Sequence, residues 1–320
     1  MASLEKIPLV PPVEPKIFRF ADVDAFRSSI RNLNVDFTPL TRKISAEQII
    51  LNLPGCDVNY TKSFPRITDG QWDRDCTVVG LMMDEGVSIR FNGFEEDHYS
   101  AITLGSGGAT YSQVERAPRE FASIVFTSGI ENRGWPHVEA GFKIILTSVA
   151  AQQALRRLIL QITSVPSPFG DTSNVAGVPA AITESLLAAV DNALADRIWP
   201  PISSGVNAAR QYKIFRDVQE VLSNDIAQPV YSGELAAQLG VSVRTLHDAV
   251  KRYRGMSLHR YLRLRRLWLV RKRLLEGSQS VKASALAFGF WHLGDFSKSY
   301  RWQFGETPSE TLARSRHTKA

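Results

Sequence analysis

Cysteine is nearly absent from this sequence, and long apolar runs are absent altogether. The 320 residues contain two cysteines, Cys56 and Cys76, which are too few for a disulfide framework and are expected to be small buried residues. No stretch approaches 18 uninterrupted apolar residues, which argues against a membrane-spanning helix. The first 16 residues lack the basic start and apolar run of a signal peptide. These absences favour a cytoplasmic protein.

The sequence also lacks the residue groups that catalysis or metal binding requires. A metal site in a small β-barrel domain needs closely spaced histidines with a carboxylate, and only His98 and His137 lie in the N-terminal two thirds of the chain. The glycine-rich run 105–108 lacks the following helix that a nucleotide-binding loop needs. No Ser/His/Asp order or paired-acid motif stands out. We therefore expect no enzyme activity, no cofactor and no metal.

Positive charge is concentrated at one end of the chain. The net charge is +6, from 38 Lys and Arg against 32 Asp and Glu. From Arg210 to the end there are 20 basic and 9 acidic residues, a balance of +11, which leaves 18 basic and 23 acidic residues, a balance of −5, for residues 1–209. This asymmetry indicates a polyanionic partner for the C-terminal end. Charge alone does not distinguish DNA from RNA or an acidic membrane.

Residues 17–145 have the pattern of short strands separated by turns, which favours a sandwich or a barrel. The clearest runs are 48–53, 76–83, 87–91, 101–104 and 121–126, with a turn at 84–86. The proline-rich residues 1–16 are expected to be disordered. A second proline-, glycine- and serine-rich break at 199–205 indicates a linker. We predict one domain over residues 1–200, a linker over 201–209 and a second domain over 210–320.

Two helices are predicted at the end of the first domain, over residues 148–162 and 180–194. The second carries an apolar stripe at helical spacing, formed by Ile182, Leu186, Val190 and Ala193. Such a stripe fits packing against the domain's own sheet and a two-helix dimer seam equally well, because it is too short to establish a coiled coil.

Residues 232–247 have the form of a helix-turn-helix. Small Ala236 lies where two helices must approach closely, and Gly240 suits the left-handed geometry of a short corner. Ser242 is a good N-cap for the second helix. Val243, Leu246 and Val250 are then expected to face inward. The outer face is predicted to carry Arg244, His247, Asp248 and Lys251, at the positions that a recognition helix presents to a major groove.

The same arrangement recurs about 50 residues later. Residues 281–288 form the predicted first helix, Gly289 and Phe290 the turn, and residues 293–303 the second helix. One match is a weak signal, but two matches joined by one long helix, predicted over residues 257–275, are a strong one. This joining helix is rich in arginine and sets the two recognition helices about one DNA turn apart, ~34 Å.

These segments resemble the AraC/XylS family of transcription regulators. The resemblance rests on Gly240-Val241-Ser242, on the stretch from Arg266 to Leu274 and, most specifically, on the stretch from Gly289 to Leu312. It covers about 100 residues firmly, and it is nearest to the branch that regulates benzoate and toluate breakdown and the ethanolamine operon. The resemblance implies an α+β protein, with an N-terminal cupin-like β-fold, dimerisation helices, and a C-terminal all-α domain with two helix-turn-helix units.

By the same resemblance, the base-facing residues are Arg244, His247 and Asp248 in the first unit and Leu293, Gly294 and Lys298 in the second. The expected phosphate contacts are Ser242, Lys251, Arg252, His292 and Arg301. Asp248 and Asp295 depart from the family, which usually has Arg at the first position and often at the second. An acidic side chain repels phosphate but can accept a hydrogen bond from cytosine. Either the preferred DNA sequence differs, or the first unit contributes mostly shape and backbone contacts.

The family resemblance implies a sequence-specific DNA-binding regulator, an activator of a catabolic operon, that acts as a homodimer with promoter DNA and RNA polymerase. A small effector of unknown identity would bind the N-terminal domain. The alternative is control by a protein partner or by abundance. Phe91, Phe94, Tyr99, Tyr111 and Trp135 are candidates for lining an effector pocket, and equally for belonging to the core.

Overall fold

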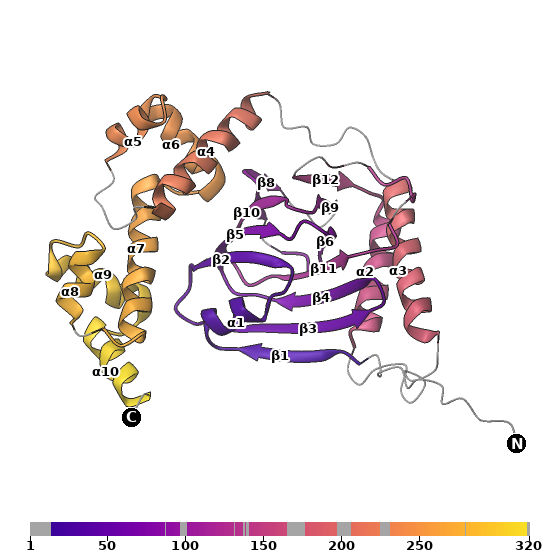
Figure 1. The fold of residues 1–320 in the computed structure, drawn as a ribbon, viewed down its shortest axis with the longest axis horizontal. Coiled ribbons are helices and arrows are strands. Elements are labelled where there is room, and N and C mark those ends of the chain that lie inside the picture. Colours follow the sequence, from indigo (N-terminus) through magenta and orange to yellow (C-terminus); the bar gives the residue numbers. More distant parts are fainter. Residues whose placement is uncertain are drawn as a thin grey trace, which may run out of the picture.

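The computed structural model describes residues 14–86, 88–96, 101–130, 132–136, 138, 141–164, 177–196, 206–224, 231–278 and 280–318. Strands dominate up to residue 146, and the elements that the structure describes from residue 149 onward are helices. We refer to the described residues up to 196 as the N-terminal domain and to those from 206 as the C-terminal domain. Figure 1 shows the two domains side by side, with one helix of the second lying along the first. The predicted α+β class is confirmed.

The strands form two antiparallel sheets in the described residues. The larger sheet has the order β1 (Lys16–Phe20), β3 (Ala46–Leu53), β4 (Cys56–Lys62), β11 (Glu120–Phe126), β6 (Thr77–Met82), β9 (Ala101–Ser106) and β12 (Phe142–Leu146). The smaller sheet has the order β2 (Leu33–Pro39), β5 (Arg66–Trp72), β10 (Thr110–Glu115), β7 (Ile89–Phe91) and β8 (Phe94–Glu96). A short helix, α1 (Val23–Ser29), connects β1 to β2.

Helices α2 (Val149–Ile162) and α3 (Val178–Ala195) cover one face of the larger sheet (Figure 1). Alternate residues of its strands, such as Val58 and Ile124, point into a core shared with the two helices. The α3 stripe of Ile182, Leu186, Val190 and Ala193 is buried in that core. The stripe therefore packs against the domain's own sheet, and its side chains are covered within one chain. Cys56 and Cys76 are free thiols and are buried, as predicted.

The C-terminal domain consists, where described, of seven helices. They are α4 (Val206–Asn224), α5 (Ser232–Gln238), α6 (Val243–Arg254), α7 (Leu258–Leu275), α8 (Val281–Ala287), α9 (Leu293–Phe304) and α10 (Pro308–Thr318). Two apolar clusters lie at the two ends of α7. The first joins it to α4, α5 and α6, and the second joins it to α8, α9 and α10. Both predicted helix-turn-helix units and the joining helix are therefore present.

Three details differ from the sequence-based expectation. Helix α4 begins at Val206, inside the range predicted as linker. Val243 was expected to face inward but is 43% exposed, because it opens α6 before the neighbouring helix covers it; Leu246 and Val250 are buried as predicted. Strand β1 includes Lys16, the last residue of the segment expected to be disordered, and residues 1–13 lie outside the described residues.

In the part of the chain that the structure describes, no helix is both long and apolar enough to cross a membrane. The same residues contain no group of three or more metal-ligating side chains. His98 and His137 lie outside the described residues.

Candidate DNA-binding interface

The first helix-turn-helix unit is shaped by its turn and its cap. Gly240 has a φ of +63°, a left-handed conformation that costs a residue with a Cβ about 1–2 kcal/mol. The Ser242 hydroxyl accepts a hydrogen bond from the Thr245 amide at 3.1 Å and so caps the start of α6. Buried Leu235 and Ala236 of α5 contribute to the same apolar cluster as Leu246. These contacts fix the angle at which α6 leaves the unit.

The outer face of α6 carries the predicted base-facing side chains. Arg244 and Asp248 have 93% and 58% exposed side chains and form an ion pair at 3.9 Å, one helical turn apart. His247 is also exposed, and its Nε2 lies 3.2 Å from the Ser232 hydroxyl of α5. Lys251 extends the exposed face by one further turn. The acidic departure from the family pattern therefore lies beside the first unit's outermost cation and partly neutralises it.

The second unit repeats this geometry with different side chains. Gly289 at the turn has a φ of +75°, and His292 is the exposed residue that precedes α9 without a side-chain cap. Gly294, Lys298 and Arg301 are exposed, whereas Leu293 is half-buried. Buried Phe296 and Tyr300 hold the other face of α9 against α7. The outer face of the second unit therefore begins with Leu293, Gly294 and the acidic Asp295, and carries the cations Lys298 and Arg301 further along α9.

Polar contacts fix the second unit to α7 and α10. The Tyr300 hydroxyl donates to Thr311 Oγ1 at 2.9 Å. Glu306 accepts hydrogen bonds from Arg271 at 2.6 Å and from Arg314 at 2.8 and 2.9 Å. Partial burial raises the Glu306 pKa, but these contacts contribute to lowering it, and the net pKa lies below its ordinary value. Glu306 therefore stays a carboxylate that links α7 to α10 near neutral pH.

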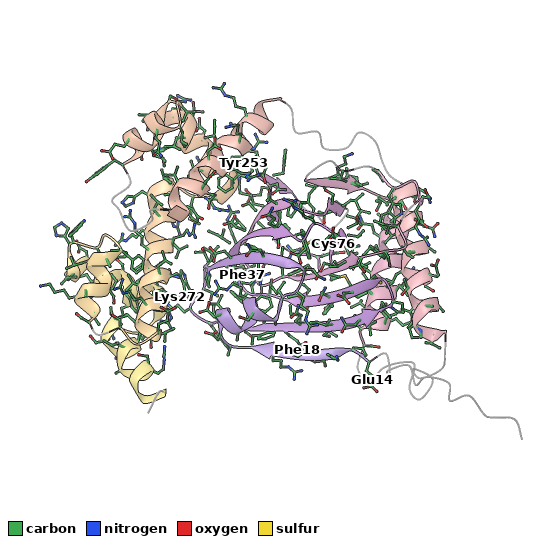
Figure 2. The ribbon with its side chains drawn as sticks, viewed as in Figure 1. Glu14, Phe18, Phe37, Cys76, Tyr253 and Lys272 are labelled. Carbon is green, nitrogen blue, oxygen red and sulfur yellow. The ribbon has the colours of Figure 1, made fainter. Side chains whose placement is uncertain are left out.

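One predicted phosphate contact faces the other domain instead of solvent. Arg252 is half-buried, donates to Gln211 Oε1 at 2.7 Å and lies over the Phe94 ring of β8 at 4.9 Å. Its carbonyl accepts from Arg90 of β7 at 2.6 Å. Arg252 therefore belongs to the junction between the domains in this arrangement, where neighbouring Tyr253 also lies (Figure 2).

Arg254, which no sequence pattern singles out, anchors this junction. Its side chain is 0% exposed. Nη2 donates to both carboxylate oxygens of Asp69 in β5, at 2.6 and 2.8 Å, and Nη1 donates to Ser112 Oγ in β10 at 2.6 Å. The guanidinium is held between the rings of Phe215 and Tyr261 at 4.5 and 4.6 Å. Burial lowers the Arg254 pKa, but Asp69 and Tyr261 together outweigh this effect, and the net pKa is raised.

Further contacts extend this junction along α7 and α4. Arg265 donates to Asp36 of β2 at 3.0 Å, and the Trp268 indole nitrogen donates to the Pro39 carbonyl at 3.0 Å. The Tyr212 hydroxyl of α4 lies 2.6 Å from Thr110 Oγ1. We call this set of contacts, with Arg254, the domain junction. It rests on the outer face of the smaller sheet.

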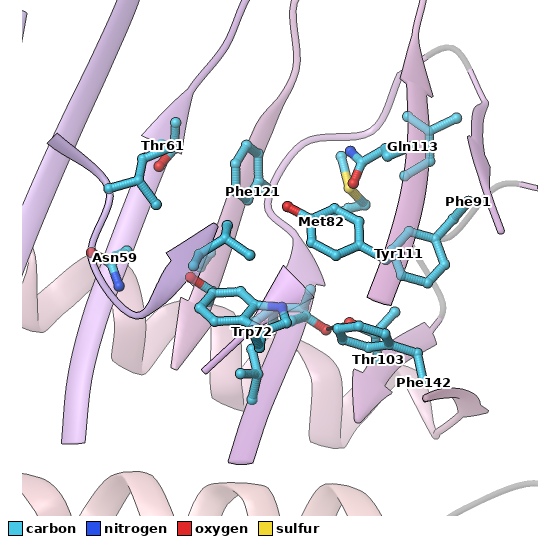
Figure 3. A pocket seen from close by; sticks show the side chains of 18 of the residues that line it. Asn59, Thr61, Trp72, Met82, Phe91, Thr103, Tyr111, Gln113, Phe121 and Phe142 are labelled. Atoms are coloured by element: carbon cyan, nitrogen blue, oxygen red, sulfur yellow. Dashed lines mark hydrogen bonds between the residues drawn. The ribbon is translucent and has the colours of Figure 1, made fainter. Parts of the chain in front are cut away.

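A cavity of about 120 Å³ lies between the two sheets, behind the domain junction (Figure 3). Its walls are mostly apolar and include several aromatic rings, and its polar lining residues include Asn59, Thr61, Thr103 and Gln113. Of the candidate pocket residues, Phe91 and Tyr111 line it. Phe94 and Trp135 do not: Phe94 lies under Arg252, and Trp135 donates to Asp191 of α3 at 2.6 Å. Tyr99 lies outside the described residues.

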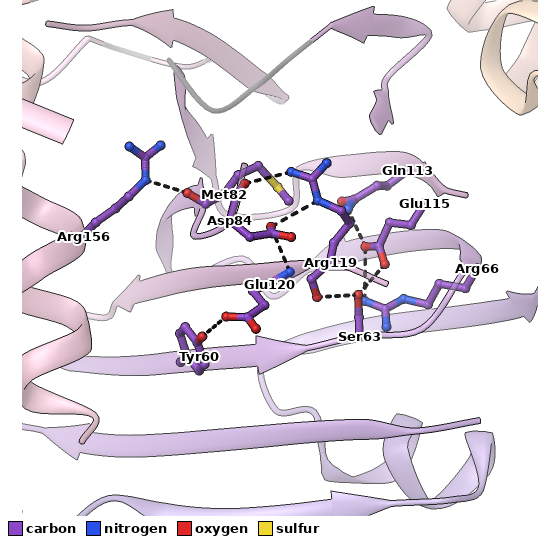
Figure 4. Close-up of polar contacts among 10 residues, drawn as sticks. All are labelled: Tyr60, Ser63, Arg66, Met82, Asp84, Gln113, Glu115, Arg119, Glu120 and Arg156. Carbon is purple, nitrogen blue, oxygen red and sulfur yellow. Dashed lines mark hydrogen bonds and ion pairs between the residues drawn. The ribbon is translucent and has the colours of Figure 1, made fainter. Parts of the chain in front are cut away.

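A buried ion pair adjoins this cavity (Figure 4). Arg66, which also lines the cavity, lies 3.4 Å from Glu115, and both side chains are almost fully buried. Burial raises the Glu115 pKa above its ordinary value, against the opposing effects of Arg66 and Ser63. Arg66 Nη1 has no hydrogen-bond partner. A buried unpaired N–H is costly, and an acceptor brought by a ligand would remove that cost.

Comparisons with known proteins agree with the geometry of the C-terminal domain. A helix-turn-helix domain family model matches residues 235–314. The XylDLEGF operon transcriptional activator 3 of Pseudomonas putida is 33% identical over 103 residues, 31% of each chain. Activator 1 from the same organism is 24% identical over 235 residues, which cover 70% of this chain and 69% of that protein. The HTH-type transcriptional activator RhaS of Pectobacterium atrosepticum is 37% identical over 87 residues, 27% of this chain and 31% of that protein.

Two solved structures also align with this chain. A probable AraC family transcriptional regulator from Rhodopseudomonas palustris is 36% identical, over 32% of this chain and 97% of that chain, with a TM-score of 0.30. The AraC-like transcriptional activator CuxR aligns over 85% of this chain and 99% of that chain at 13% identity, with a TM-score of 0.39. The match to the first of the curated relatives spans about a third of that protein's length.

Proposed function

We propose that this chain is a regulator of the AraC/XylS family that binds promoter DNA sequence-specifically and activates a catabolic operon under the control of a small effector. One observation carries the DNA-binding part. Two helix-turn-helix units with exposed outer faces lie at the two ends of a single helix, α7. A helix of 18 residues spans about 27 Å, comparable with one turn of DNA once the recognition helices are added.

In this proposal the outer faces of α6 and α9 read bases. Arg244, His247 and Asp248 contact one half-site, and Leu293, Gly294 and Lys298 contact the next. Ser242, Lys251, His292 and Arg301 lie beside these residues, where phosphate oxygens flank a major groove. Arg252 can contact phosphate only if the domain junction opens, because its side chain otherwise contacts Gln211 and Phe94.

Replacing one residue of each outer face tests this assignment. Arg244→Ala is expected to cost about 1–3 kcal/mol on the preferred duplex and to relax one base position, and Lys298→Ala to relax a position in the other half-site. Binding is measured by fluorescence anisotropy on duplexes selected with the full chain. Lys213→Ala is the matched control, because Lys213 is an exposed, ion-paired cation of α4 in the same domain. An equal loss from Arg244→Ala on every sequence would assign Arg244 to phosphate instead.

The cavity between the sheets supports the effector part of the proposal. Its largely apolar walls suit a small molecule with an apolar body, and the unpaired N–H of Arg66 suits a hydrogen-bond acceptor on that molecule. We expect such a ligand to raise the melting temperature of the full chain and to change its affinity for DNA.

A screen of small carboxylates, amines and aromatic alcohols by thermal shift checks this expectation. Asn59→Leu removes a polar group from the cavity wall and should reduce the ligand's stabilising effect. Asn52→Leu, at an exposed position bonded to Asp57, should not. A screen without any stabilising compound would favour control by a protein partner.

We extend the proposal to a cytoplasmic homodimer that contacts RNA polymerase at the promoter. The relatives named as operon activators support this extension. A dimer interface would have to use a surface other than the buried α3 stripe. Sedimentation equilibrium of the full chain distinguishes a dimer from a monomer.

A further inference from the structure

A second, larger cleft lies between the two domains, on one side of the domain junction. Its volume is about 860 Å³, within the range of ligand sites, about 300–1,000 Å³. One wall comes from the N-terminal domain, through Arg116 and Val114, and the floor is the apolar side of α7. The opposite wall is α9, through Lys298 and the exposed ring of Trp302. Figure 1 shows α7 between the smaller sheet and helices α8 and α9.

The charge of this cleft has one sign. Arg116, Arg260, Arg263 and Lys298 line it, and no acidic residue is among the described residues that do. Arg116 bonds Glu95, which also bonds Arg90 and is not among the residues that line the cleft. Among the described residues, Arg263 bonds the Ser299 hydroxyl of α9 and no carboxylate. Where the chain is described, no ion pair joins Arg260, Arg263 or Lys298 to a carboxylate, so the cleft holds uncompensated positive charge and favours an anion.

The position of the cleft indicates which anion would bind in it. It extends from Gly255, where the first recognition helix ends, to Lys298 on the second recognition helix. When two recognition helices occupy successive major grooves, the backbone between the grooves passes the protein surface that lies between the helices. A cationic surface at that place meets phosphodiesters.

We propose that this cleft receives the phosphodiester backbone of the bound DNA and that Arg116 contributes to DNA binding from the N-terminal domain. The proposal rests on the proposed DNA-binding function and adds a contact outside the helix-turn-helix units. It makes the closed arrangement of the two domains a DNA-binding arrangement, because Arg116 reaches the cleft only while the domain junction is intact. The position of the N-terminal domain thereby bears directly on affinity.

The salt dependence of DNA binding by the full chain tests the proposal. Each phosphate contact contributes about 0.9 to the slope of log K against log salt concentration on B-DNA. Arg116→Ala should therefore lower the magnitude of the slope by about 0.9, so that its affinity deficit shrinks about 3.5-fold between 50 and 200 mM salt. Arg263→Ala, on the floor of the cleft, should have a similar effect, and Arg116→Lys should keep the wild-type slope.

Arg19→Ala is the matched control. Arg19 is also an ion-paired surface arginine of the N-terminal domain, but it lies on β1, the edge strand of the other sheet. The substitution Arg19→Ala changes the net charge as much as Arg116→Ala does, and its salt-dependence slope should equal that of the wild type. The melting temperature of each variant verifies folding.

Three results would overturn the proposal. The first is an unchanged salt-dependence slope for Arg116→Ala. The second is tighter DNA binding by the Arg116→Ala variant, which would mean that Arg116 hinders DNA binding. The third is that a free nucleotide stabilises the wild type saturably, and that Arg116→Ala abolishes this stabilisation without changing the salt-dependence slope of DNA binding. That result would make the cleft a nucleotide site. A wild-type chain with no salt-dependent binding to duplex DNA would instead refute the proposed function itself.

Discussion

The substitution Asp69→Asn is the sharpest probe of how the two domains are held together. Asp69 supplies the only carboxylate that ion-pairs with Arg254 in the described residues, and Arg254 is fully buried. Asparagine has nearly the same size and keeps one carbonyl acceptor. The substitution therefore removes the negative charge and one acceptor while leaving the Arg254 contacts to Ser112 and Tyr261 in place.

The structure sets the expected magnitude. Breaking a fully buried ion pair costs about 3–5 kcal/mol, and losing an exposed one costs about 0.2–1 kcal/mol. Asp69 keeps 30% of its side-chain exposure, so water partly compensates, and we expect about 2 kcal/mol. That free energy corresponds to a shift of about 30-fold in the equilibrium between docked and undocked domains.

A double-mutant cycle with Arg254→Gln measures this coupling. Urea unfolding is followed by far-ultraviolet circular dichroism, to which the helical C-terminal domain contributes strongly. We expect a coupling free energy of about 2 kcal/mol between the two positions. Asp57→Asn, on the exposed β3–β4 hairpin, provides the control cycle and should show no coupling to Arg254. A coupling below about 0.5 kcal/mol for Asp69 would refute the view that this ion pair holds the domains together.

Two further predictions concern the helix-turn-helix units. Gly240→Ala should lower the free energy of unfolding by about 1–2 kcal/mol in urea titrations. A Cβ at position 240 would meet no neighbouring atom, so the cost comes from the left-handed backbone alone. Gly294→Ala is the control and should not destabilise the chain, because position 294 in α9 has equally open space and no positive φ. Asp248→Asn should tighten binding to non-specific DNA several-fold at low salt, because it frees Arg244 and removes a repulsion from phosphate. A loss of affinity confined to sites with one particular cytosine would show that Asp248 reads that base.

Local sequence signals were sufficient to predict the helices and the turn of the first helix-turn-helix unit. The small residue at 236, the glycine at 240 and the cap at 242 act over a few residues, and the structure has helices and a turn where these signals predict them. The same holds for strands with strongly apolar runs, such as β6 and β11. Strand β10 was not predicted because polar residues interrupt its apolar ones. Two of these polar residues, Thr110 and Ser112, bond the other domain.

The domain junction and the two cavities could not be predicted from the sequence. Arg254 and Asp69 are 185 positions apart, and neither has a neighbourhood that differs from an ordinary charged surface. Arg252 was assigned to phosphate because it lies on a basic recognition helix, whereas packing against Phe94 of the other domain decides its position. Such pairings depend on how two separately folded surfaces meet, which no local pattern encodes.

Hydroxyl-radical footprinting of the full chain on its preferred duplex tests the central claim, that two recognition helices on one joining helix read successive major grooves. We expect two protected segments on one face of the duplex, separated by about 10–10.5 base pairs. Arg244→Ala should weaken the protection of one segment, and Lys298→Ala that of the other. A single protected segment, or two segments on opposite faces of the duplex, would contradict it.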